Sequence, residues 1–559
     1  MTASKIQTAL SLGCLLIAAA MAALVMLIAW QCQWAGPFRD YWEVMPLIET
    51  TFTQPISHWP WHELWAPYGG AHRLVIPKLL FIADFHTTGG SNRLILSASI
   101  LCLMMAAGLI IRRVQQCYGA TPMLYLASAI SLVTLFSATQ LFNLNYSYDT
   151  QWFQVTGLSV LALYLASHTR LSTHYWPYAV AAMAAGTLAS LSNMAGFLVW
   201  PPLGLLLWCA AHNTTQRLTT AVITLCILIG YLHGLHTSST AEPFSGVLDI
   251  LGWLLGGMML FARFIPLYLG SPFTKAAPIL AGFITAGALG WVLWQGWRAR
   301  HRTQPQHALQ LLLSAIAVQA LLVAMATAWG RRYYHIDMAM ADRYQAIAML
   351  FWLAVGISIL MRLQRRHTGL AIAMTATLTG ALMPFQIQSV YSAVRLANAV
   401  QSGHLGLAMG FTEMHVAANT LSHPAIQKNY NYAARHNSFL QQHRLAYFKN
   451  SNLALIGTIL DTHNISPSNC HFNVTYSAAL ASHNAQELNG RWQCPSTVNS
   501  ILLIDRKNTV VGLLEKPLAS WLLDIPWSGY VHAFSRPLIP VGIAPSHEAR
   551  LIGSPLDTP

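Results

Sequence analysis

Eleven apolar stretches dominate this sequence, and most are long enough to cross a membrane. A helix spans the hydrocarbon core with about twenty residues. Because 55% of the 559 residues are hydrophobic and only 9% are charged, a water-soluble globule is excluded. We therefore predict a polytopic α-helical membrane protein with about eleven transmembrane helices. The predicted spans are residues 8–30, 93–111, 122–142, 153–168, 176–193, 197–212, 218–236, 277–297, 308–329, 345–363 and 369–391.

The charged residues of the loops predict how these spans are oriented. Arginines cluster in alternate loops, and none of those loops contains an acid. Basic loops face the cytoplasm in most membrane proteins. The first span lacks a small-residue cleavage site, so we expect it to be retained. An odd number of spans then places the N-terminus in the cytoplasm and the C-terminus outside.

The composition changes after the last span. Residues 1–391 form the predicted membrane region, with a long first outer loop at 31–92, and residues 392–559 form a soluble outer domain. This domain is predicted to begin with a helical linker and to continue as a β-rich module. In "SILLIDRKNTVVGLLEK", residues 506–508 are expected to turn a hairpin between two apolar strands. We expect an α+β domain containing a small β-sandwich.

Cysteines and motifs narrow the functional classes. Cys470 and Cys494 both lie in the outer domain, where an oxidising compartment favours a disulfide. The sequence contains no CxxC, HExxH, Walker or GxSxG motif, which removes the usual support for a metal hydrolase, a nucleotide-driven pump or a serine hydrolase. We predict no metal site and no cofactor, although a divalent metal is compatible with the sequence. Membrane topology explains most of the net charge of +13, and no nucleic-acid partner is expected.

The first outer loop carries the leading catalytic candidates. Asp40 and Glu43 occur in "RDYWE", and the spacing of Val44, Leu47 and Ile48 is typical of a short amphipathic helix at the membrane surface. A carboxylate partly removed from water becomes more basic and can accept a proton from a hydroxyl group. An acid at this point can also simply favour the start of a helix.

Three other places offer ligand-binding side chains. His72 and Arg73 follow two glycines, and Arg73 offers a planar fork to phosphate, unless it pairs with lipid headgroups. Asp149, Trp152 and Gln154 form a second group that suits a sugar ring, although Trp152 is equally typical of an interfacial anchor. Arginines near the end of the membrane region, beside a tyrosine, suit a lipid-linked phosphate, unless Asp337 and Asp342 neutralise them. This third group is Arg331, Arg332, Arg343 and Tyr344.

Taken together, these features resemble the GT-C superfamily of membrane glycosyltransferases. The resemblance covers the membrane region and rests on "RDYWE", "YDTQWFQ", "LSNMAGFLVWP" and "DRYQ", with a β-rich module after the spans. It implies a hexosyl- or pentosyltransferase of the bacterial inner membrane. The sugar would pass from a polyprenyl-phosphate donor to a glycan, lipid or protein acceptor on the periplasmic side.

The resemblance also implies roles for individual residues. Asp40 matches the acid that serves as catalytic base, and Glu43 is its possible helper or replacement. Arg331, Arg332 and Arg343 would hold the carrier phosphate. The second acid stays open between Glu43, Glu49 and Asp149. Two other classes also stay open, namely a polymerase or ligase of lipid-linked glycans, and a non-catalytic transporter or flippase. The transporter would need more ionisable groups inside its spans than the sequence provides.

Overall fold

The computed structural model describes most of the chain. It covers residues 3–68, 72–235, 276–300, 304–331, 342–364, 367–411, 435–460, 471–480, 485–493, 498–532, 538–543, 549–552 and 556. These residues divide by their contacts into two compact units. The helical unit consists of Met1–Leu27, Trp61–Leu79 and Leu96–Val390. The β-containing unit consists of Ile28–Pro60, Leu80–Ile95 and Tyr391–Pro559, so parts of the first outer loop group with the C-terminal region.

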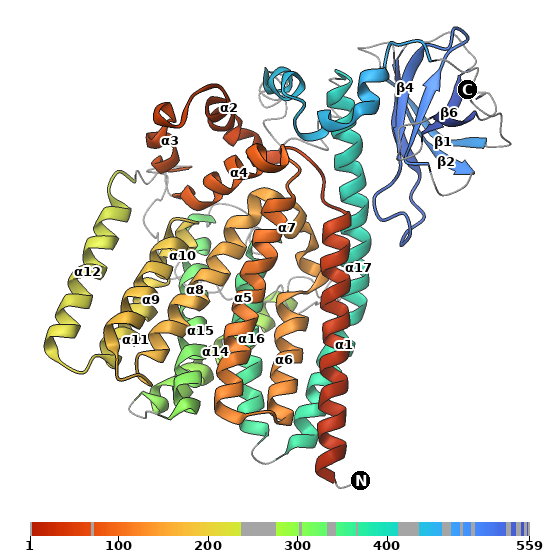
Figure 1. The fold of residues 1–559 in the computed structure, drawn as a ribbon. Coiled ribbons are helices and arrows are strands. Elements are labelled where there is room, and N and C mark those ends of the chain that lie inside the picture. The colour runs from red at the N-terminus through yellow and green to blue at the C-terminus, as the bar shows by residue number, and fades with distance from the viewer. Residues whose placement is uncertain are drawn as a thin grey trace. The chain divides into compact units, whose positions relative to one another are not determined.

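Each of the eleven predicted spans coincides with a helix. These helices are α1 (Ala3–Gln31), α5 (Arg93–Tyr118), α6 (Pro122–Leu135), α8 (Thr150–His168), α9 (Tyr175–Ser190), α11 (Trp200–Ala210), α12 (Thr214–Leu232), α14 (Ala276–Ala299), α15 (Pro305–Arg331), α16 (Gln345–Leu363) and α17 (Thr368–Ala408). Among the described residues, seven helices are long and apolar enough to cross a membrane, and Met194–Ala210 is a shorter apolar helical stretch. Within the helical unit, α5, α6, α8, α9, α15 and α16 run side by side (Figure 1).

Short helices connect the long ones. They are η1 (Arg39–Val44), α2 (Met45–Thr53), η2 (Ile56–His58), α3 (Trp61–Trp65), α4 (Val75–Thr88), η3 (Ala138–Gln140), α7 (Leu141–Asn145), η4 (Ser147–Asp149), α10 (Met194–Phe197), η6 (Asp342–Tyr344), η7 (Ala446–Lys449) and η8 (Ser451–Leu455). The predicted amphipathic helix of the first outer loop is present as η1 and α2. Val44, Leu47 and Ile48 are buried, as their spacing predicted.

Helix α17 is longer than a membrane is thick. Its 41 residues correspond to about 62 Å, about twice the hydrocarbon core. The apolar stretch that predicts this helix ends at residue 391, yet the helix continues to Ala408. Residues 392–408 therefore extend the span as a helix into the region predicted to be soluble.

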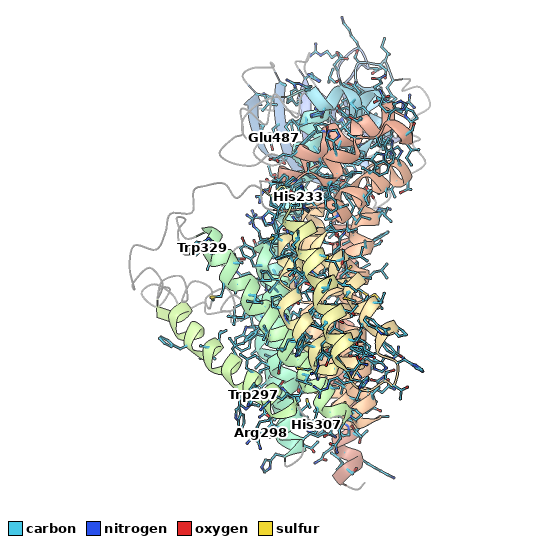
Figure 2. All side chains as sticks on the ribbon, turned by 90° about the vertical axis from the view of Figure 1, so that its left-hand side faces the viewer. His233, Trp297, Arg298, His307, Trp329 and Glu487 are labelled. Atoms are coloured by element: carbon cyan, nitrogen blue, oxygen red, sulfur yellow. The ribbon has the colours of Figure 1, made fainter. Side chains whose placement is uncertain are left out.

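The basic loops meet at one end of the helical unit. Arg170 donates a hydrogen bond from Nη2 to the carbonyl of Arg300 at 2.6 Å, which joins two of these loops. In Figure 2, Arg298 and His307 lie at this end of the unit, whereas His233 and Trp329 lie toward the other end. Basic residues of two loops that are distant in sequence therefore lie at the same end of the helical unit.

The β-containing unit includes one antiparallel sheet of seven strands in the order β1-β2-β5-β4-β3-β6-β7. The strands are β1 (His471–Leu480), β2 (Ala485–Gln493), β3 (Ser500–Ile504), β4 (Val510–Glu515), β5 (Trp527–His532), β6 (Ile539–Ile543) and β7 (Ala549–Ile552). Alternate residues of β3 enter two different apolar clusters, Ile501 and Leu503 in one and Leu502 and Ile504 in the other. Both faces of β3 are thus covered, which explains its continuous apolar sequence.

The predicted hairpin joins β3 to β4. Ser500 pairs with Glu515 at its open end. At the turn, Asp505 Oδ1 accepts hydrogen bonds from the backbone N–H groups of Lys507 at 2.8 Å and Thr509 at 3.0 Å. Asn508 has φ +60°, a conformation that asparagine tolerates better than most residues. The turn at residues 506–508 is therefore confirmed. Cys470 and Cys494 lie outside the described residues, so their disulfide stays a prediction.

Candidate functional site

Polar side chains are buried at one end of the helical unit, where the chain passes from α6 through η3, α7 and η4 into α8. An unpaired buried polar group costs roughly 1–3 kcal/mol, so such side chains are expected to bond to one another. With Asn193, from the loop before α10, we call them the polar cluster. Its members are Gln140, Asn143, Asp149, Gln151, Gln154 and Asn193.

The polar cluster joins this segment to the start of α16. Asn143 donates a hydrogen bond from Nδ2 to the carbonyl of Asp342 at 2.6 Å. Gln345 donates from Nε2 to Thr139 Oγ1 at 2.7 Å. Two loops separated by some 200 positions in sequence are therefore bonded directly.

A third loop reaches the polar cluster through Asn193. Its Oδ1 accepts a hydrogen bond from the N–H of Ala195 at 2.9 Å and so caps α10. Its Nδ2 donates to Gln151 Oε1. The cap indicates a packing role for this loop. The bond to Gln151 adds a link to the polar cluster that the sequence did not show.

Aromatic residues adjacent in sequence to members of the polar cluster contact one another. Trp152 is buried and meets Tyr344 edge to face, with ring centroids 5.3 Å apart at 88°. Tyr148 contacts Tyr68 at 5.6 Å and Tyr146 at 6.1 Å. Rings beside amide and carboxylate groups suit a sugar, which presents apolar faces and hydroxyl edges.

Two acceptors of the polar cluster remain available. Within the described part of the chain, Gln154 Oε1 and Asn143 Oδ1 are buried and have no hydrogen-bond partner. Buried acceptors normally bond to protein, water or ligand. A hydroxyl group entering the polar cluster could satisfy them.

The predicted arginines are placed in part. Arg343 is half-buried in η6, and its guanidinium lies 5.9 Å from the centroid of the Tyr344 ring. Asp342, which precedes Arg343, accepts a hydrogen bond from Asn143 through its backbone carbonyl. Arg331 is the last residue of α15. Arg332 and Asp337 lie outside the described residues.

Arg73 holds backbone segments of the helical unit together. It is buried and donates from Nε to the carbonyl of Tyr231 at 2.9 Å and from Nη1 to that of Trp65 at 2.6 Å. Nη2 donates to the carbonyl of His233, the C-cap of α12. A cation is favourable at this negative end of a helix. Its guanidinium is thus engaged with protein, while the neighbouring His72 forms a backbone bridge with Tyr68.

In the β-containing unit, Asp40 and Glu43 share one face of η1. Residues three apart eclipse each other in a 3₁₀-helix. Asp40 is half-buried and Glu43 exposed, whereas Tyr41 and Trp42 between them are buried. Tyr41 packs on Phe81 with ring centroids 4.4 Å apart. The two aromatic residues therefore anchor the turn and leave both carboxylates on its outer side.

A buried carboxylate fixes the segment that leads into this turn. Asp84 accepts hydrogen bonds from Thr88 Oγ1 at 2.7 Å and from the N–H groups of Asn92 at 2.9 Å and Leu94 at 3.2 Å. Burial raises the pKa of the Asp84 carboxyl, and these three hydrogen bonds oppose the rise. Asn92, held in this way, has φ +63°.

Asn92 and His404 then bind the backbone before Asp40. Asn92 Nδ2 donates to the carbonyls of Trp34 at 3.1 Å and Gly36 at 2.8 Å. His404 Nε2 donates to the carbonyl of Pro37 at 2.8 Å. Gly36 has φ +94°, and a Cβ there would lie 3.0 Å from that of Ala446, so glycine is needed. The approach to η1 is therefore rigid.

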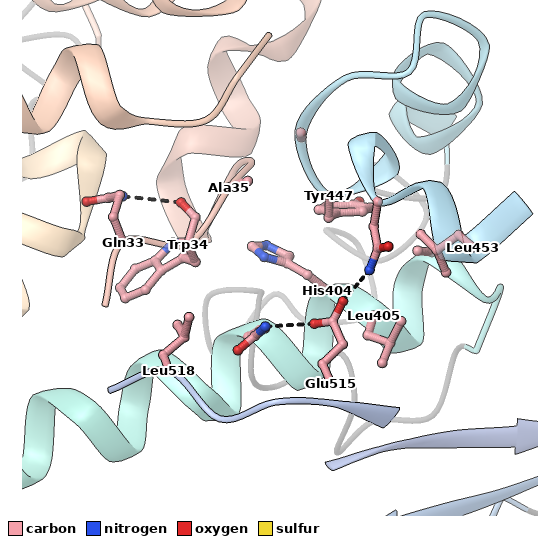
Figure 3. A pocket seen from close by; sticks show the side chains of 13 residues that line it. Gln33, Trp34, Ala35, His404, Leu405, Tyr447, Leu453, Glu515 and Leu518 are labelled. Carbon is pink, nitrogen blue, oxygen red and sulfur yellow. Dashed lines mark hydrogen bonds between the residues drawn. The ribbon is translucent and has the colours of Figure 1, made fainter. Parts of the chain in front are cut away.

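A cavity of about 230 Å³ adjoins this segment (Figure 3). Glu515 lines it and accepts hydrogen bonds from Gln401 Nε2 at 2.8 Å and Asn450 Nδ2 at 2.5 Å. Burial raises the pKa of Glu515, and the two amide bonds oppose this. His404 stacks on Tyr447 with ring centroids 4.8 Å apart. A carboxylate, two amides and stacked rings form a setting in which sugar hydroxyls can bind.

Glu49, another acid of the first outer loop, has a protein partner. Its Oε1 lies 2.5 Å from His436 Nδ1, and His436 is almost fully buried. This contact ties α2 to the chain after α17. Of the three acids that follow the first span, Asp40 and Glu43 thus share a face of η1, whereas Glu49 is engaged elsewhere.

Comparisons with known proteins give one match. No protein-family model matches the chain, and no curated protein matches it. Among solved structures, the apo state of ArnT from Cupriavidus metallidurans is similar, with 13% sequence identity and a TM-score of 0.42. The match covers 83% of this chain and 96% of that one. At this identity and TM-score, the similarity assigns no function to the chain.

Replacing Asp84 by asparagine should destabilise the β-containing unit. The backbone N–H groups that now donate to the Asp84 carboxylate would face the N–H donors of the new amide. We therefore expect a loss of roughly 1–3 kcal/mol in the free energy of unfolding. Thermal unfolding in nanodiscs measures it. Asp524→Asn is the control, because its ion pair with Arg491 is exposed and such pairs contribute little. Equal losses in both variants would contradict the role given to Asp84.

Replacing Arg73 by lysine should loosen the end of α12. An ammonium cannot reach the three carbonyls that the guanidinium binds, and each abandoned partner costs roughly 1–3 kcal/mol. We expect faster amide hydrogen exchange at residues 229–235, measured by mass spectrometry. Arg395→Lys serves as control, because Arg395 is exposed and bonds only to Tyr391 among the described residues. Unchanged exchange in Arg73→Lys would show that the carbonyl contacts are dispensable.

Proposed function

We propose that this protein is a membrane glycosyltransferase that uses a polyprenyl-phosphate sugar as donor. Its acceptor would be a glycan, lipid or protein on the periplasmic side of a bacterial inner membrane. The observation that carries the proposal is the polar cluster. It is built where three loops, distant in sequence, meet at the end of apolar helices.

A polar cluster in this position favours a substrate that is partly lipid and partly sugar. The apolar spans beside it suit a polyprenyl tail, and the amides and rings suit a sugar. Gln154 Oε1 and Asn143 Oδ1 provide acceptors for hydroxyl groups. The cavity lined by Glu515 adds a second place where an acceptor sugar can bind.

The reaction needs a base and a group that counters phosphate charge. We assign the base to Asp40, which removes a proton from the acceptor hydroxyl as its oxygen attacks the anomeric carbon. The bond from that carbon to the phosphate oxygen breaks, and polyprenyl phosphate leaves. Arg343 is assigned to the phosphate, whose developing charge a guanidinium stabilises. Glu43, on the same face of η1, is proposed to assist Asp40.

The alternatives differ in how they depend on Asp40. A polymerase or ligase of lipid-linked glycans would also use arginine at a phosphate, but would tolerate the loss of this acid better. A transporter would consume no donor at all. Donor turnover measured in wild type and in an Asp40 variant therefore separates all three classes.

Asp40→Asn should abolish transfer while leaving insertion into the membrane intact. Loss of a general base lowers the rate by about 10²–10⁴-fold. The measurement is donor consumption in nanodiscs, using a panel of polyprenyl-phosphate sugars with wild type and variant side by side. Glu63→Gln is the matched control, because Glu63 is an exposed acid of the same loop. An Asp40→Asn protein with normal turnover would remove the assignment of the base.

Arg343→Ala should weaken the use of donor. A lost hydrogen bond to a charged group costs about 1.5–3 kcal/mol, which corresponds to roughly a 10–150-fold fall in kcat/KM for the donor. Arg343→Lys keeps the charge without the planar fork, so an intermediate value is expected. Steady-state kinetics with varied donor concentration gives both values. If Arg343→Ala keeps the wild-type kcat/KM, another cation binds the phosphate.

A further inference from the structure

A second cavity lies at the basic end of the helical unit, far in sequence from the polar cluster. It measures about 250 Å³ and lies among the ends of three helices. Helix α14 contributes Gln295 and Arg298, α15 contributes His307 and Gln310, and α16 contributes Ser358 and Arg362. The polar cluster and the assigned catalytic residues use none of these side chains.

The charges around this cavity are of one sign. Arg298 and Arg362 line it, and no acid is among the described residues that line it. The surrounding sequence, residues 291–310 and 356–375, contains no aspartate or glutamate. Cations that converge without a protein anion favour an anion from outside.

The uncharged lining groups are suited to the same kind of ligand. Gln310 Nε2 donates to Ser358 Oγ at 3.4 Å, which aligns two of these side chains across α15 and α16. The amide of Gln295 and the imidazole of His307 add further donors. Phosphate oxygens accept hydrogen bonds, and arginine binds them in a planar fork.

Exposed tryptophans place this cavity at the level of lipid headgroups. Trp294 and Trp297 are 48% and 64% exposed at the same end of α14. The guanidinium of Arg298 lies 4.8 Å from the centroid of the Trp294 ring, and that of Arg300 lies 3.3 Å from that of Trp297. Figure 2 shows Trp297, Arg298 and His307 together at this end. Tryptophan is enriched where membrane meets water.

We propose that this cavity binds the phosphate of an anionic phospholipid headgroup. Basic pockets between transmembrane helices are suited to such headgroups. The lipid would connect α14 to α16 through Arg298 and Arg362, two helices whose cationic ends otherwise repel each other. This site is independent of the proposed glycosyltransferase reaction.

Native mass spectrometry of the full-length protein tests the proposal. Wild type is titrated with phosphatidylglycerol and, separately, with zwitterionic phosphatidylcholine. We expect one phosphatidylglycerol to bind more tightly than the rest. The double variant Arg298→Gln/Arg362→Gln should bind it about tenfold more weakly or worse. Arg217→Gln is the matched control, because Arg217 also lies beside an exposed tryptophan, Trp208, but does not line the cavity. Equal binding by wild type and double variant overturns the proposal.

Two further measurements keep the result decisive. The wild type is measured against increasing NaCl, so that the outcome does not depend on how well the double variant folds. Loss of the tight phosphatidylglycerol with salt supports the site, and indifference to salt overturns it. Inorganic phosphate is then added to protein in phosphatidylcholine nanodiscs. If phosphate alone raises the midpoint of thermal unfolding as much as phosphatidylglycerol does, the ligand is a free anion and the headgroup assignment is wrong.

Discussion

The bond network of Asp84 is the interaction on which the candidate catalytic segment depends. Its carboxylate fixes the backbone of Asn92, and the Asn92 side chain in turn fixes the backbone at Trp34 and Gly36. Only a few residues separate Gly36 from the turn that carries Asp40. A buried carboxyl group, costly to remove from water by itself, thus fixes the backbone that leads to Asp40, the proposed base. The placement of Asp40 is set from within the fold and not by the exposed loop alone.

The helical unit obeys a related constraint. Polar groups near the hydrocarbon region must find partners within the protein, because lipid offers none. The loops around Asn143, Asn193 and Asp342 therefore bond to each other. Once three loops have converged for this reason, a few unmatched acceptors such as Gln154 Oε1 are enough to create a place for a hydroxyl-bearing ligand. Stability and the proposed sugar binding thus draw on the same side chains.

The sequence predicted what depends on neighbouring residues. Spans follow from length and hydropathy, the β3–β4 hairpin follows from its turn residues, and burial of Val44 follows from helical spacing. The loop contacts could not be predicted, because Asn143 and its partner Asp342 lie 199 positions apart. The contacts of Arg73 could not be predicted for the same reason. Its glycine-rich context indicated a ligand, but its carbonyl partners at Tyr231 and His233 come from a distant helix end.

The apolar run of β3 has a consequence for how this chain can evolve. When one face of a strand is exposed to water, a register shift by one residue is unfavourable because it moves apolar side chains into water. Both faces of β3 contact apolar clusters, so its apolar side chains discriminate less between registers. The turn stabilised by Asp505 therefore largely determines the register between β3 and β4. An insertion or deletion of one residue there would move Glu515 by about 3.3 Å and reverse the side of the sheet it faces. Small length changes in this hairpin are thus a route by which related chains could replace the carboxylate of the adjoining cavity by another side chain without substituting Glu515 itself.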